Sequence, residues 1–161
     1  MRDATARPAT FTDVKLLINA LNEAGADYFL IGGYALYAHG YHRATEDVDI
    51  LIPANRQAGE IVKKALLKLP DKAAKEIDVN WIEDGETIRI ADEFVVDILM
   101  NASGETYETL EIYKEVINVD GIPITTLSLE GLIKTKQSAR AKDKQDRVIL
   151  EKALERLKKD R

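Results

Sequence analysis

The sequence of 161 residues contains no cysteine, which excludes disulfide bonds and metal sites built on thiolates. It has no apolar run near the roughly 18 residues of a membrane-spanning helix, and residues 1–14 lack the apolar core of a signal peptide. We therefore expect a cytoplasmic protein with no membrane partner. The two histidines, His39 and His42, are three residues apart, and without a further histidine or cysteine they make a weak case for zinc.

Two catalytic patterns are also missing. There is no Gly-Lys-Ser/Thr sequence of a Walker-type phosphate loop, and we find no Ser–His–Asp or Cys–His set for nucleophilic catalysis. The net charge of −5 is unevenly spread, because residues 134–161 carry 11 Lys or Arg against 5 Asp or Glu, a balance of +6 that leaves −11 for the rest. This basic segment would favour phosphate-bearing ligands, although a solvated amphipathic helix explains the same pattern.

Apolar periodicity interleaves helices with strands along the chain. We expect an α/β (α+β) fold, in which a mixed sheet is flanked by helices and followed by a C-terminal helical segment. The length suits a single domain over residues 1–161, with a core of about 11–127 and C-terminal helices of about 128–159. The spacing predicts helices over 10–25, 34–40, 55–69, 105–116 and from 128 onward, and strands over 27–31, 47–53, 79–84, 86–91, 93–100 and on both sides of Asp120-Gly121.

Two aspartates, Asp47 and Asp49, interrupt the apolar strand "DVDILI". Side chains alternate between the two faces of a strand, so both carboxylates project from one face while Val48 and Ile50 pack from the other. Hard cations such as Mg²⁺ take carboxylate oxygens together with substrate phosphates, and a third acid, Asp97, stands in the apolar strand "FVVDILM". If the two strands are neighbours, the three carboxylates form a site for two metal ions; otherwise they are the solvent-facing side of a half-exposed sheet.

Gly32 and Gly33 lie between a predicted strand and a short predicted helix. Glycines there let backbone N–H groups approach an anion closely, so the pair is either a phosphate cradle or a plain tight turn. Arg43 follows, and it offers its guanidinium either to phosphate oxygens or to a surface ion pair with Glu46. Lys136 and Arg140 in the basic tail are open to the same two interpretations, ligand contact or ordinary helix surface.

These residues together resemble a known group of proteins. "GGYALYAHGYHRATEDVDILI", with the later "VVDILM" and the tail "LSLEGLIKTKQSARAKDKQDRVIL", is similar to the DNA polymerase β-like nucleotidyltransferase superfamily over about residues 28–150. The arrangement of His-Gly before Arg-x-Thr-x-Asp-hydrophobic-Asp resembles its small prokaryotic members, including the nucleotidyltransferase-type toxins of abortive-infection systems. The resemblance implies a nucleotidyltransferase-like fold and membership of a toxin–antitoxin pair, with an antitoxin-like protein as a possible partner.

The resemblance also implies a reaction and roles for individual residues. The enzyme would transfer a nucleoside monophosphate from an NTP to an acceptor and release pyrophosphate, with Mg²⁺ (or Mn²⁺) as cofactor. Asp47, Asp49 and Asp97 would be the catalytic, metal-binding residues, with Asp97 helping to deprotonate the acceptor hydroxyl. The nucleotide-binding residues would be Gly32, Gly33, Arg43, Lys136 and Arg140, while Asp143 and Asp146 match acidic positions of the family.

One position departs from the family pattern. Many active members place a serine after the first glycine, whereas this chain has Gly33, so its phosphate contacts rest on backbone amides. A catalytically silent protein that binds nucleotide or a partner is therefore the alternative to an enzyme. For the enzyme, the acceptor stays open among an RNA such as tRNA, a protein and a small molecule; the basic tail favours an anionic acceptor, while the acidic body opposes one.

Overall fold

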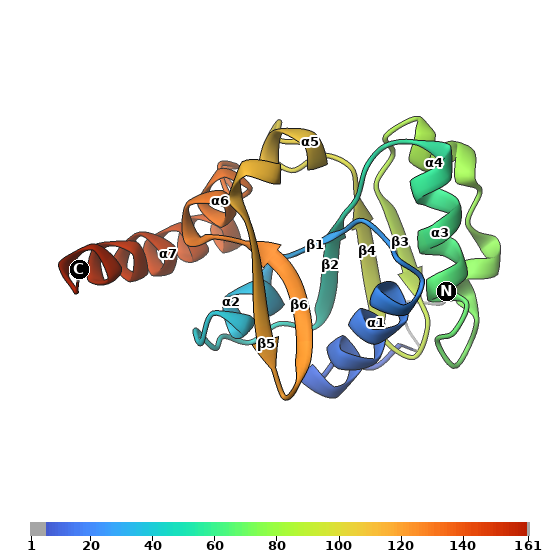
Figure 1. The fold of residues 1–161 in the computed structure, drawn as a ribbon, viewed down its shortest axis with the longest axis horizontal. Coiled ribbons are helices and arrows are strands. Elements are labelled where there is room, and N and C mark those ends of the chain that lie inside the picture. The colour runs from blue at the N-terminus through green and yellow to red at the C-terminus, as the bar shows by residue number, and fades with distance from the viewer. Residues whose placement is uncertain (1–5, 161) are drawn as a thin grey trace.

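The computed structural model describes residues 6–160, and within them a mixed sheet of six strands is surrounded by helices (Figure 1). The elements are α1 (Phe11–Glu23), β1 (Phe29–Ile31), α2 (Gly33–Ala38), β2 (Asp47–Leu51), α3 (Arg56–Leu66), η2 (Ala73–Glu76), α4 (Val79–Glu83), β3 (Ile88–Ala91), β4 (Val95–Leu99), α5 (Tyr107–Leu110), η3 (Glu111–Tyr113), β5 (Lys114–Val119), β6 (Ile122–Leu127), α6 (Leu129–Lys134) and α7 (Ala141–Lys159). This confirms the expected mixed α/β class.

The strand order is β3-β4-β2-β1-β6-β5. β2 pairs with β4 in parallel and with β1 in antiparallel orientation, so the strand that carries two aspartates lies next to the strand that carries the third. Alternation divides β2 as expected: Val48 and Ile50 are fully buried, while Asp47 and Asp49 are only partly buried. The acids therefore share one face of the sheet and the core lies against the other.

Local capping fixes where the helices begin. Thr10 is the N-cap of α1 and forms a capping box with Asp13, so the helix begins at Phe11. Asn55 caps α3 and Ser128 caps α6, because the side-chain oxygen of each accepts a hydrogen bond from a backbone N–H of the first turn. Figure 1 shows α3 and α4 near one end of the sheet, and α6 and α7 at the other.

Two predicted elements are wrong. Alternation predicts a strand over 79–84, but this segment forms α4, with Asp78 as N-cap. Its Trp81 is 41% exposed, because α4 packs against α3 and leaves this side chain at the surface. The prediction of one helix over 105–116 also fails, since only Tyr107–Leu110 is α-helical; η3 follows and β5 begins at Lys114, which pairs with Leu127 of β6.

The C-terminal segment is helical with one interruption. Residues 135–140 separate α6 from α7, and this turn is held by Ser103, whose hydroxyl donates to the Thr135 carbonyl and accepts from the Gln137 amide. α7 then extends away from the sheet and ends near the C-terminus (Figure 1). Within residues 6–160, no helix has the length and apolarity required to cross a membrane.

Candidate active site

The acidic face of β2 and β4 is the centre of the site. In the parallel register Asp49 stands directly opposite Asp97, and Asp47 lies two residues before Asp49 on the same face. The side chains of Asp47 and Asp97 are 32% and 16% exposed, so they border solvent without being surface residues. The structure thus brings the three aspartates onto adjacent strands, side by side.

Arg89 on β3 lies between two of these acids. Its Nη2 donates to Asp47 Oδ2 over 2.8 Å, and its Nε and Nη2 donate to the two Asp97 oxygens over 3.1 and 3.2 Å. β3 is the strand next to β4, and Arg89 is the register partner of Asp97. In this arrangement, the described residues contain no group of three His, Cys, Asp or Glu side chains placed to hold a metal ion.

The crowding of carboxylates changes their protonation. Burial, followed by the negative charge of Asp97, raises the pKa of Asp49 to about 7, although Lys136 opposes the shift. Burial also raises the pKa of Asp97, and the Arg89 guanidinium counteracts part of that rise. At neutral pH this pair therefore carries less than its full negative charge, and a cation that reaches it relieves the repulsion.

The two glycines are fitted closely against the site. Gly32 has φ +74°, and a Cβ at this position would overlap the Oδ2 of Asp49. A Cβ on Gly33 would lie 2.7 Å from both Cβ and Oγ1 of Thr45. Both positions thus exclude a side chain, and the Thr45 hydroxyl occupies the space where a side chain of residue 33 would begin.

Basic residues approach the acids from the loop before β2 and from the C-terminal segment. Arg43 donates from Nε and Nη2 to the two oxygens of Asp146 over 2.7 and 2.9 Å, so the interpretation that pairs it with Glu46 is wrong. Lys136 Nζ lies 3.0 Å from the same buried carboxylate. These contacts keep the pKa of Asp146 below its usual value despite burial, so Asp146 remains a charged anchor for two cations.

Asp143, the other buried acid of α7, holds the remaining cations of the tail. It accepts a hydrogen bond from the Ser138 hydroxyl and lies 3.5 Å from Arg140 Nη2 and 3.7 Å from Lys136 Nζ. The Arg140 side chain is 76% exposed, so it reaches into solvent beside the site. The tail thus supplies one enclosed cation, Lys136, and one exposed cation, Arg140, to the same edge.

These residues line two adjoining cavities. One, of about 160 Å³, is lined mainly by charged and polar side chains; the other, of about 230 Å³, is bordered by Gly32 and by the turn between α6 and α7. Asp49, Lys136 and Arg140 line both cavities. All eight residues predicted for catalysis, metal binding or nucleotide binding border one or both: Gly32, Gly33, Arg43, Asp47, Asp49, Asp97, Lys136 and Arg140.

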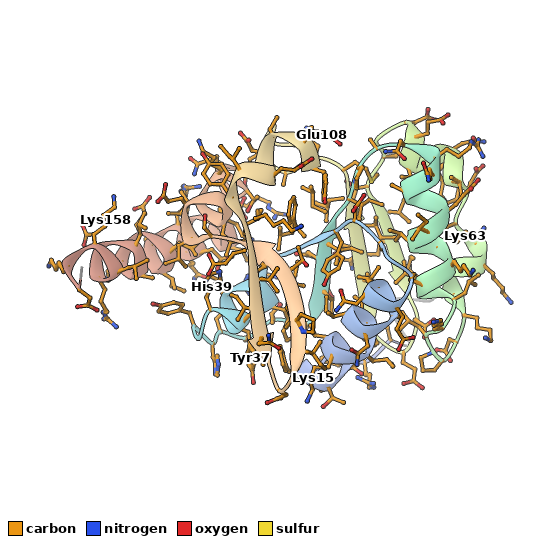
Figure 2. All side chains as sticks on the ribbon, in the orientation of Figure 1. Lys15, Tyr37, His39, Lys63, Glu108 and Lys158 are labelled. Carbon is orange, nitrogen blue, oxygen red and sulfur yellow. The ribbon has the colours of Figure 1, made fainter. Side chains whose placement is uncertain are left out.

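A larger cavity, of about 390 Å³, lies elsewhere, between the segment after α2 and the C-terminal half of α7. Figure 2 labels His39 and Lys158, which line it. None of the three aspartates borders this cavity, and His39 Nε2 is already 2.8 Å from the Leu127 carbonyl oxygen. Size alone is therefore a poor guide here, because the predicted site residues line the two smaller polar cavities.

Sequence reasoning missed two residues of the site. Arg89 lies in a strand whose partner cannot be identified from periodicity, and an arginine on an exposed strand face carries no signal of its own. Thr45 can be interpreted as a simple turn residue; its place in Arg-x-Thr-x-Asp is the available signal, because it lies just before the acidic strand. Both line the cavity of about 160 Å³.

Comparison with known proteins identifies the family to which this geometry belongs. A family model described as "Nucleotidyl transferase AbiEii toxin, Type IV TA system" matches residues 15–149, which is most of the chain. The chain belongs to the AbiEii nucleotidyltransferase toxin family. The match includes the glycine pair, the three aspartates and the tail as far as Asp146, so the resemblance inferred from the sequence is confirmed.

Solved structures support the fold of this AbiEii family member. A protein from Thermotoga maritima assigned as a nucleotidyltransferase superimposes with a TM-score of 0.56 and 17% identity, covering 94% of this chain and 93% of its own. An antigenic nucleotidyltransferase-like protein from Paracoccidioides brasiliensis gives a TM-score of 0.52 and 18% identity, covering 90% and 78%. At these identities the likeness shows the fold alone. A search of curated protein sequences gave no match.

Proposed function

We propose that this AbiEii family member is a metal-dependent nucleotidyltransferase, which transfers an NMP from an NTP to an acceptor hydroxyl and releases pyrophosphate. The observation that carries the proposal is the register of β2 and β4, which sets Asp49 opposite Asp97 with Asp47 on the same face, beside the glycine pair. Nucleotidyl transfer requires positioning and charge neutralisation more than covalent participation by the protein, and that is what this cavity offers.

The chemistry of the donor set fits a hard divalent cation, although the three side chains as they stand, with Arg89 between two of them, are not placed to hold one. Asp47, Asp49 and Asp97 offer only carboxylate oxygens, which are the ligands that Mg²⁺ and Mn²⁺ prefer, and the pKa of Asp49 is raised first by burial and then by the negative charge of Asp97. These three residues would hold Mg²⁺ (or Mn²⁺), which would neutralise charge on the transferring phosphoryl group and its leaving pyrophosphate. The same cation would replace the proton that Asp49 otherwise retains near neutral pH.

Phosphate binding, nucleotide contact and proton acceptance would fall to different residues of the chain. The backbone at Gly32 and Gly33 would receive the β- and γ-phosphates, with the Thr45 hydroxyl beside Gly33 supplying the donor that a serine provides in other members. Lys136 and Arg140 would contact the nucleotide from the tail, and Arg43 would add its charge while Asp146 fixes its position. Asp97 would accept the proton of the attacking hydroxyl as the new O–P bond forms and the bond to pyrophosphate breaks.

Transfer assays test the proposal directly. Purified protein is incubated with each α-labelled NTP, Mg²⁺ or Mn²⁺, and a panel of acceptors that includes tRNA, proteins and small hydroxyl compounds. Pyrophosphate release and label transfer are expected together, and Asp47→Asn or Asp49→Asn should reduce both by at least about 100-fold. Asp78→Asn, a change on the N-cap of α4 outside the two cavities, is the matched control and should retain activity.

A second candidate, a silent protein that binds nucleotide or a partner, is favoured by one observation. Arg89 pairs with both Asp47 and Asp97, so a side chain of the protein itself balances charge at these two acids. This candidate predicts that an NTP raises the midpoint of thermal unfolding while no acceptor yields pyrophosphate. Pyrophosphate release that depends on Asp49 would eliminate it.

The family description also bears on partners. It assigns AbiEii proteins to type IV toxin–antitoxin systems, so the proposal includes an antitoxin as the second component. Induced expression of the chain alone is expected to arrest bacterial growth, and Asp49→Asn should abolish the arrest. Growth arrest that persists unchanged in Asp49→Asn would separate toxicity from nucleotidyl transfer.

A further inference from the structure

Arg89 contacts the oxygens that a metal ion would need. Asp47 Oδ2 and both oxygens of Asp97 accept hydrogen bonds from its guanidinium, over 2.8 to 3.2 Å. Hydrogen bonds between two ionised groups are among the stronger polar contacts in proteins, and this one bridges two strands of the sheet. A divalent cation at the same oxygens would stand in contact with a second fixed positive charge. The guanidinium and the cation therefore compete for one place.

We propose that Arg89 is an internal counter-ion of the acidic site, which occupies the metal-binding oxygens of Asp47 and Asp97 until a divalent cation displaces its guanidinium. The inference rests on the metal dependence in the proposed function and adds a residue to it. It also explains how Asp47 and Asp97 lie side by side on neighbouring strands. Arg89 is a positioning residue in this account, because it acts through the aspartates.

The surroundings of Arg89 allow the displacement. Its side chain is 47% exposed, and β3 is an edge strand of the sheet, so no core residue has to move when the guanidinium leaves. Arg89 also borders a cavity of about 260 Å³ whose lining includes Glu76, Trp81 and Ile90. An arginine that turns toward this cavity leaves Asp47 and Asp97 for a site that offers the Glu76 carboxylate and the Trp81 ring, both favourable neighbours for a cation.

A consequence is that metal and nucleotide bind best together. Metal alone must displace Arg89 and gains only the carboxylate oxygens, whereas metal that arrives with a triphosphate brings additional oxygen ligands with it. The cost of displacing Arg89 is the same in both cases, but the phosphate oxygens offset it only when nucleotide is present. Arg89 therefore keeps free metal out of the site at concentrations at which the metal–nucleotide pair still binds.

Direct titration of the full chain with Mn²⁺ tests the inference, with free Mn²⁺ followed by electron paramagnetic resonance and no nucleotide present. We expect Arg89→Gln to bind Mn²⁺ about tenfold more tightly than the unsubstituted protein, which corresponds to ~1.4 kcal/mol. Arg89→Lys keeps the charge but cannot bridge two carboxylates in the same way, so its affinity should lie between the two. Arg56→Gln removes an arginine of similar exposure that pairs with Glu60 and Glu83 on the surface, and it should change nothing.

Trp81 gives a second readout, because it is the only tryptophan in the chain and lines the cavity beside Arg89. Mg²⁺ should shift its fluorescence in the unsubstituted protein and not in Arg89→Gln. Unchanged or weaker Mn²⁺ binding in Arg89→Gln, when Asp49→Asn does lose the metal, would overturn the role of Arg89 alone. Absence of Mn²⁺ binding in every variant would overturn the metal site and this inference with it.

Discussion

Replacing Asp49 with asparagine is expected to stabilise the metal-free protein above neutral pH. The folded carboxyl has a pKa of about 7 against an ordinary value of 3.8, which at ~1.36 kcal/mol per pH unit amounts to at most ~4 kcal/mol of destabilisation by the ionised group. Because the two carboxyls titrate together and the asparagine amide must itself be accommodated in a mostly buried place, we expect a gain of ~2 kcal/mol at pH 8. For a domain of this size that raises the Tm by roughly 4–8 °C.

The sign follows from proton uptake. The Asp49 carboxyl keeps its proton to higher pH in the folded than in the unfolded protein. Its ionisation therefore costs no stability below pH about 4, and it lowers the free energy of unfolding as the pH rises through about 7. The asparagine of the Asp49→Asn variant cannot ionise. The difference in free energy of unfolding between the variant and the unsubstituted protein should therefore increase from pH 5 to pH 8. Urea unfolding with a metal chelator, followed by circular dichroism, measures it, and Asp84→Asn on an exposed turn is the control. A difference in free energy of unfolding that stays constant across this pH range would refute the electrostatic account.

Three further substitutions test other parts of the site. Gly32→Ala places a Cβ onto Asp49 at a positive φ and should lower the free energy of unfolding by ~1–3 kcal/mol in urea titrations; unchanged stability would contradict the close fit. Thr45→Val should raise the KM for the NTP by roughly tenfold, as expected for one lost hydrogen bond, whereas Thr45→Ser should leave the KM unchanged. Equal KM values in the two variants would show that the hydroxyl does not bind the NTP. Asp146→Asn deprives Arg43 of its buried counter-ion and should cost ~3 kcal/mol of stability, whereas a neutral result would mean that solvent replaces the carboxylate.

The acidic strands were predictable because their signal is local. Alternation places Asp47 and Asp49 on one face whatever the rest of the chain does, and the apolar neighbours of Asp97 mark a similar strand. The glycine pair was recognisable in the same way, but the reason for it was not. Only the structure shows that Gly32, the N-cap of α2, makes room for the Asp49 carboxylate of β2.

The parts that failed depend on contacts between distant segments. Residues 79–84 alternate like a strand, yet Asp78 caps a helix there and the segment packs on the surface. Arg89 became part of the site only through the pairing of β3 with β4, which periodicity does not specify. The pairing of Arg43 with Asp146 joins residues 103 positions apart, so the neighbouring Glu46 was the wrong partner. Long-range pairing is what local patterns leave undetermined.

The central claim is that Asp47, Asp49 and Asp97 bind a divalent cation together with the triphosphate of an NTP. Crystals grown with Mn²⁺ and a non-hydrolysable NTP, measured at the manganese absorption edge, test it most directly. The account predicts anomalous density in contact with all three carboxylates, with the β- and γ-phosphates beside Gly32 and Gly33 and the Arg89 guanidinium withdrawn. Manganese bound elsewhere, or a nucleotide bound with Arg89 still joining Asp47 to Asp97, would contradict it.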